Sequence, residues 1–98
     1  MGSTGNLNLP KGWYLPADSE CALIQSQLQN EIGEGHALYG QKLSLVARRR
    51  DQDDILAKTG EGRVVEIHMT WRSSPERDPD WPSARFFQDL DSWLATQP

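Results

Sequence analysis

The chain has 98 residues, of which 37% are hydrophobic and 24% are charged, a composition that is ordinary for one globular domain. Ten Lys and Arg residues stand against fourteen Asp and Glu residues, and the net charge of −4 argues against a nonspecific nucleic-acid binder, which needs a strongly basic surface. Cys21 is the only cysteine, so an intramolecular disulfide is excluded and a reducing compartment is favoured. The sequence has neither an apolar run of transmembrane length nor a signal-peptide pattern at its start, so we expect a cytoplasmic protein without a membrane segment.

An amphipathic helix is the first predicted element. Residues 1–12 are rich in small polar residues and are expected to form a flexible tail, followed by a single domain over residues 13–98. Cap-forming and acidic residues around Asp18 indicate a helix start, and Gly33 indicates its end. We place the helix at about 17–32, because one apolar stripe recurs there at spacings of three and four: Cys21, Ile24, Leu28 and Ile32.

Three strands are predicted after this helix, over residues 42–49, 54–58 and 63–71. Apolar and polar residues alternate in the last of them, which is the period of a strand with two chemically different faces. The connections are short, and short connections favour an antiparallel meander over parallel crossovers. A polar loop with three prolines spans residues 72–82. We expect Ser83 to cap a last helix, because apolar residues then recur with a helical period: Phe86, Phe87, Leu90, Trp93 and Leu94.

These elements predict an α+β fold, a three-stranded antiparallel meander flanked by an N-terminal and a C-terminal helix in the order α-β-β-β-α. The simplest packing sets both helices on one face of the sheet, where they bury Val65, Ile67 and Met69. The opposite face is then open to solvent and carries these polar residues: Ser44, Arg48, Glu66, His68 and Thr70.

The two histidines are the first candidates for chemistry, because histidine titrates near neutral pH and binds metals. His36 and His68 could form a site with Asp53, Asp54 or Glu66, but their spacing matches no metal-ligand pattern, and we predict no metal or cofactor. The alternative for His36 is a turn residue whose ring bonds a backbone carbonyl. The alternative for His68 is cross-strand ion pairing.

Other chemistries find less support in the sequence. Hydrolysis is disfavoured, because the serines lack a GxSxG elbow and Cys21 lies on the apolar helical stripe. The basic run at residues 48–50 is followed at once by acidic residues, which indicates a strand end with local charge compensation rather than a phosphate site. Trp71, Arg72 and Trp81 bracket the proline-rich loop, either as a recognition patch or as anchors of the loop on the core.

Three segments together resemble a family of small bacterial proteins of unknown function with the pattern GHxLYG … VARR … DDxL … HLTW. The matching segments here read GHALYG over residues 35–40, VARR over 46–49 with DDIL over 53–56, and IHMTW over 67–71. Ala37 and Met69 stand where Pro and Leu are expected from the resemblance. The resemblance implies a bacterial cytosolic domain and no particular activity. It draws attention to its polar and aromatic positions: His36, Asp53, Asp54, His68, Thr70 and Trp71.

We therefore predict a small cytosolic, non-enzymatic protein-interaction or regulatory module, present as a monomer or a homodimer. The alternative is a small enzyme or metal-binding domain that uses His36, His68 and Asp53 or Asp54. Nucleic-acid binding ranks third because of the net charge. The candidate surface comprises His36, Arg48, Asp53, Asp54, Glu66, His68, Thr70, Trp71, Arg72 and Trp81.

Overall fold

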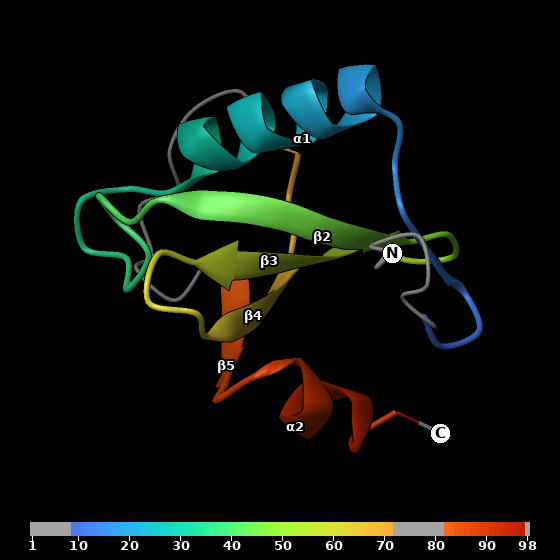
Figure 1. Ribbon diagram of the computed structural model, residues 1–98. Coiled ribbons are helices and arrows are strands. Elements are labelled where there is room, and N and C mark those ends of the chain that lie inside the picture. The colour runs from blue at the N-terminus through green and yellow to red at the C-terminus, as the bar shows by residue number, and fades with distance from the viewer. Residues whose placement is uncertain (1–8, 72–81, 98) are drawn as a thin grey trace.

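A five-stranded antiparallel sheet forms the centre of the protein, as seen in a computed structural model that describes residues 9–71 and 82–97 (Figure 1). The spatial order of the strands is their order in the chain, and each strand pairs antiparallel with the next, so the sheet is a simple meander. The strands are β1 (Trp13–Tyr14), β2 (Leu43–Arg49), β3 (Asp54–Thr59), β4 (Val64–His68) and β5 (Ser83–Phe87).

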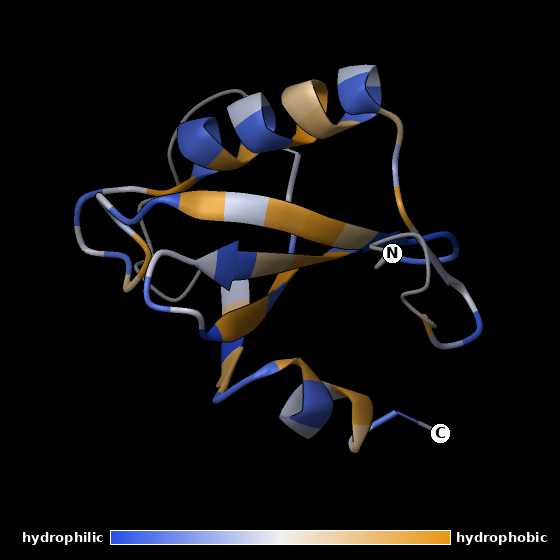
Figure 2. Ribbon diagram, viewed as in Figure 1, coloured by the Kyte–Doolittle hydropathy of each residue, from blue (hydrophilic) through white to orange (hydrophobic). Residues whose placement is uncertain are grey.

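Helix α1 (Asp18–Glu31) covers one face of the sheet. Asp18 and Glu20 lie in its first turn, where negative charge is favourable next to the helix dipole. Ile24 and Leu28 are almost fully buried and belong to a core cluster with the apolar side chains of the sheet. Figure 2 shows hydrophilic residues over much of the outer side of α1, and Leu23 is an exposed apolar exception in this helix. The sheet contributes these buried residues to that cluster: Leu43, Ile55, Ala57, Val65 and Ile67.

Helix α2 (Leu90–Leu94) lies on the opposite face of the sheet (Figure 1). Asp89 caps it by accepting a hydrogen bond from the Ser92 backbone N–H at 2.8 Å. Trp93 is fully buried and meets Trp13 edge to face, with the ring centroids 5.0 Å apart. The second core cluster comprises Trp13, Ala47, Leu56, Val64 and Trp93.

A β-bulge in β2 supplies part of the second cluster. The pairing register between β2 and β3 shifts between Leu45 and Ala47. Val46 is the extra residue, and both Val46 and Ala47 pack with the second cluster, whereas Leu45 packs with the first. The bulge therefore lets two consecutive residues serve the α2 side of the sheet.

The α+β class and the antiparallel meander of the prediction are confirmed, but the prediction of three strands and of two helices on one face was wrong. Residues 13–14 form β1, and the helix expected from Ser83 is strand β5 followed by the short α2. Phe86 packs with the first cluster and Phe87 with the second, so consecutive residues serve opposite faces, as in a strand. Each face of the sheet carries an apolar core cluster and is covered by one helix. None of the helices in the described ranges has the length and hydropathy needed to cross a bilayer.

Candidate functional site

Five side chains form a continuous series of contacts that we call the Trp71 surface: Tyr14, Glu20, Arg48, Arg50 and Trp71. Arg48 is central, because its Nη1 lies 2.9 Å from Glu20 Oε2 and its guanidinium carbon lies 5.2 Å from the centroid of the Trp71 ring. The Tyr14 hydroxyl donates to the same Glu20 oxygen, and the Arg50 guanidinium carbon lies 4.4 Å from the Tyr14 centroid. Two cations are thus held over two aromatic faces by cation–π contacts.

A buried carboxylate fixes the backbone beneath this surface. Glu31, at the end of α1, is fully buried. Its Oε1 accepts hydrogen bonds from the Thr70 backbone N–H at 2.8 Å and the Thr70 hydroxyl at 3.0 Å. Its Oε2 accepts from the Trp71 backbone N–H and from Gln27 Nε2, both at 2.7 Å. The acid therefore satisfies two successive backbone donors after β4 and sets the course of the chain at Trp71.

The conformation of Trp71 is unusual in two respects. Its φ is +59°, in the left-handed region that bulky side chains rarely adopt. Trp71 is also a large hydrophobic residue that stays 41% exposed, so core packing does not explain its backbone conformation. The hydrogen bonds that Glu31 accepts from the Thr70 and Trp71 backbone N–H groups hold the backbone in place while the indole remains at the surface.

Sequence reasoning missed Glu31, although one signal was present. Glu31 follows Leu28 by three residues and Ile24 by seven, and it therefore falls on the apolar stripe of the helix. A charged residue at such a position is buried only when it has partners. The sequence does not say where those partners lie, because Thr70 and Trp71 are about forty residues away.

A hydrogen bond shifts the pKa values of two side chains in this surface, Glu20 and Tyr14. The bond from the Tyr14 hydroxyl, followed by the Arg48 guanidinium, holds the pKa of Glu20 below its usual value. The same bond raises the pKa of the Tyr14 phenol. Glu20 is therefore charged and Tyr14 protonated at neutral pH. Burial raises the pKa of Cys21, which disfavours its thiolate and agrees with a structural role.

The two histidines form hydrogen bonds with different partners. His68 Nδ1 lies 2.7 Å from Asp54 Oδ1, and Arg49 Nη1 lies 4.0 Å from the other oxygen of the same carboxylate. The Asp54 side chain is 10% exposed and that of His68 is 47% exposed, so the carboxylate is mostly covered and the ring is open to solvent. Because Nδ1 faces the carboxylate, Nε2 is the ring nitrogen left for other contacts.

His36 is a buried structural residue. The Leu38 backbone N–H donates to its Nδ1 at 3.0 Å, which assigns the ring proton to Nε2. Nε2 lies 2.6 Å from the Pro82 carbonyl oxygen and donates to it. The ring therefore ties the connector between α1 and β2 to the start of β5, and both of its nitrogens are engaged.

The other predicted residues are scattered. Glu66 accepts a hydrogen bond from Trp93 Nε1 at 2.8 Å, so α2 covers part of the face that was predicted to be open, and that prediction was wrong. The Asp53 side chain is exposed, and its backbone carbonyl accepts from the Met69 N–H at 2.8 Å. Two predicted residues lie outside the described residues: Arg72 and Trp81.

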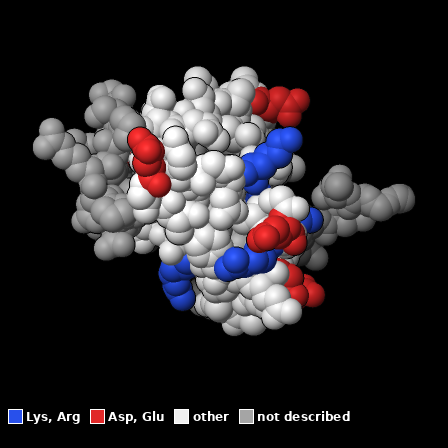
Figure 3. All heavy atoms as spheres, turned by 90° about the vertical axis from the view of Figure 1, so that its left-hand side faces the viewer, with Lys and Arg blue, Asp and Glu red and all other residues white. Residues whose placement is uncertain are grey.

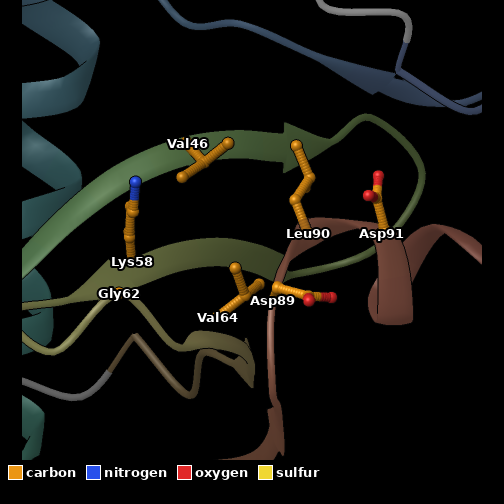
Figure 4. A pocket seen from close by; sticks show the side chains of 7 residues that line it. All are labelled: Val46, Lys58, Gly62, Val64, Asp89, Leu90 and Asp91. Carbon is orange, nitrogen blue, oxygen red and sulfur yellow. The ribbon is translucent and has the colours of Figure 1, made fainter.

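A hollow of about 410 Å³ opens beside α2 (Figure 4). Val46, Val64 and Leu90 supply apolar lining, and the Lys58 amine and the Asp91 carboxylate stand on opposite sides in Figure 4. Asp89 also borders the hollow, but its carboxylate caps α2. The lining therefore carries both charges and does not select a ligand of one sign.

In the described part of the chain, neither the surface charge nor the grouping of metal-binding side chains indicates a further ligand site. Figure 3 shows one side of the molecule, on which basic and acidic side chains are interspersed. Within residues 9–71 and 82–97, no group of three or more His, Cys, Asp or Glu side chains is arranged to hold a metal ion.

Comparisons with protein-family models, with curated proteins and with solved structures found no match for this chain.

Proposed function

We propose that this chain is a cytoplasmic protein-interaction module that binds an acidic segment of a partner protein through the Trp71 surface. The observation that carries the proposal is the exposed indole of Trp71 on a left-handed backbone that a buried carboxylate holds in place. The proposal keeps the bacterial, cytosolic setting implied by the sequence resemblance.

The energetics of Trp71 support a role outside the fold. A non-glycine residue held in a sparsely populated backbone region costs of order 1–3 kcal/mol, and such residues cluster at functional sites. Glycine would adopt the same φ without that cost. Trp71 gains little from core packing in return, since much of it is exposed. A tryptophan kept in this position is therefore better suited to contact another molecule than to stabilise its own.

The chemistry of the surface indicates the partner. Trp, Tyr and Arg are the residues that dominate binding energy at protein interfaces. Arg48 and Arg50 stack on aromatic rings, and guanidinium groups recognise carboxylates by paired hydrogen bonds. Within the surface, Glu20 is the single acid against these two cations. An acidic segment with an apolar residue for the indole is complementary to this arrangement, whereas a second copy of a chain with charge −4 is less so.

The alternative of a small enzyme or metal-binding domain loses one of its residues. His36 uses both ring nitrogens inside the protein, so it has none to offer a substrate or a metal. The other two residues of this alternative, His68 and Asp54, do contact each other.

The test is affinity capture from a bacterial lysate with the wild-type chain and two variants, Trp71→Gly and Arg48→Ala. Trp71→Gly removes the indole and suits the positive φ, so it is expected to keep or slightly raise the melting temperature. Loss of a tryptophan hot spot of about 2 kcal/mol weakens binding about thirtyfold, and quantitative mass spectrometry should record a partner depleted to that extent. Binding should also weaken as salt is raised.

Arg63→Ala is the matched control, because Arg63 also stacks on an aromatic ring, that of Phe86. It lies next to the β3–β4 turn, where the Thr59 N–H donates to its carbonyl oxygen, away from the Trp71 surface. Capture should be unchanged in this variant. Equal capture by wild type and Trp71→Gly, or no specific capture, would overturn the proposal. A wild-type dimer that Trp71→Gly dissociates in sedimentation would replace the acidic partner by a second copy.

A further inference from the structure

Three residues with complementary chemistry lie in one row across neighbouring strands. Asp54 of β3 is the register partner of His68 of β4, and His68 is the register partner of Ser83 of β5. Directly paired residues on antiparallel strands place their side chains on the same face, with Cβ atoms about 4.5–5.5 Å apart. Asp54, His68 and Ser83 therefore follow one another on the α2 side of the sheet.

The middle residue of this row is already oriented. Its Nδ1 lies 2.7 Å from Asp54 Oδ1, and the ring is thereby turned with Nδ1 toward β3. Nε2 is the ring nitrogen that Asp54 does not engage, and Ser83 is the register partner of His68 on the neighbouring strand β5. A histidine whose Nδ1–H is bonded to a carboxylate carries its lone pair on Nε2, the arrangement of a general base.

We propose that the Asp54–His68–Ser83 row is a nucleophilic acyl-transfer site, in which the Ser83 hydroxyl takes an acyl group from an activated ester. His68 is the general base and Asp54 is the positioning residue. This inference goes beyond the proposed interaction function and uses none of the residues of the Trp71 surface.

The reaction balances with water as the only co-reactant. Ser83 Oγ attacks the ester carbonyl carbon and passes its proton to His68 Nε2. The bond between the carbonyl carbon and the leaving oxygen breaks, and His68 returns the proton to that oxygen. Water then attacks the acyl carbon and passes a proton to His68. The bond between that carbon and Ser83 Oγ breaks, His68 returns the proton to Oγ, and the products are a carboxylic acid, the alcohol and free Ser83.

The exposure of the row permits this chemistry and limits its rate. The His68 side chain is 47% exposed and Ser83 is partly exposed, so a small ester can reach both. Base catalysis by a positioned side chain contributes about 10²–10⁴-fold. We therefore expect slow, selective acylation of one serine rather than rapid turnover.

The experiment incubates the full chain with para-nitrophenyl acetate and follows nitrophenolate release together with the acetylated residues, located by peptide mass spectrometry. Ser83 is expected to acquire one acetyl group. Ser83→Ala should abolish that adduct, and His68→Gln should slow its formation at least tenfold, as base catalysis requires. Asp54→Asn should slow it as well, and Asp54→Glu should recover part of the rate, which a purely structural role for the carboxylate does not predict.

Ser44→Ala is the matched control, because Ser44 is an exposed strand serine whose register partner is Lys58 rather than a histidine. It should leave the Ser83 adduct unchanged. Circular dichroism of each variant establishes that it is folded, and His68→Gln is expected to be, given the exposure of the ring. An absent Ser83 adduct, or one that forms equally fast in folded His68→Gln, overturns the proposal.

Discussion

Substitution of Glu31 tests the link between the buried acid and the Trp71 surface. The carboxylate accepts four hydrogen bonds: two from backbone N–H groups, one from a hydroxyl and one from a side-chain amide. Glu31→Gln preserves the volume but turns one acceptor into an NH2 group that faces donors, which costs about 1.5–3 kcal/mol, the worth of hydrogen bonds to a charged group. Glu31→Ala leaves both backbone donors without their acceptor, at about 1–3 kcal/mol for each buried unsatisfied group. Partial access of water at Trp71 lowers the sum, and we expect about 2–4 kcal/mol for Glu31→Ala.

Urea unfolding followed by far-ultraviolet circular dichroism measures these losses. A domain of this size has a free energy of unfolding of about 5–15 kcal/mol, so the loss is a substantial share and is easily resolved. Glu34→Ala is the control, because Glu34 is an exposed acid just beyond the same helix and should change the stability by about 0.5 kcal/mol or less. Glu31→Gln should also weaken partner capture, although Glu31 is buried. If Glu31→Ala proves no more destabilising than Glu34→Ala, the carboxylate does not hold the backbone as argued.

Two further predictions concern the α2 side. Trp93→Ala should lower the free energy of unfolding by about 3–5 kcal/mol in urea unfolding, because the ring is fully buried and its N–H donates to Glu66. Phe87 is only partly buried, so Phe87→Ala should cost clearly less. Equal costs would contradict the assignment of β5 to the sheet edge. The hydrogen bond from the Ser92 N–H lowers the pKa of Asp89, so its contribution to stability is present above the usual aspartate range and is lost as the pH falls through the lowered pKa. Asp89→Ala should therefore destabilise at neutral pH, and urea unfolding should show the difference from wild type shrink as the pH is lowered below the usual aspartate range.

Local patterns predicted much of the secondary structure. The helical stripe through Ile24 and Leu28 predicted α1, which the structure places at Asp18–Glu31. The alternation in residues 63–71 predicted β4 and the burial of Val65 and Ile67. Short connections correctly predicted an antiparallel meander. These features follow from period and loop length, which a sequence displays directly.

The last segment shows where period alone fails. Phe86, Phe87, Leu90, Trp93 and Leu94 fit a helical stripe. The same spacing also fits a strand with one phenylalanine on each face, followed by a single helical turn or so. The choice between them depends on pairing with β4, a long-range interaction that a short segment does not reveal.

The sequence by itself thus determined the α+β class, the meander and the residues buried beneath α1. Only the tertiary structure decided which residues meet. The cross-strand register brings Asp54, His68 and Ser83 into one row, and the packing of α1 brings Glu31 to the backbone of Trp71. Register and helix docking join residues that lie up to about forty positions apart, and their energies arise in the folded state, so no local pattern records them.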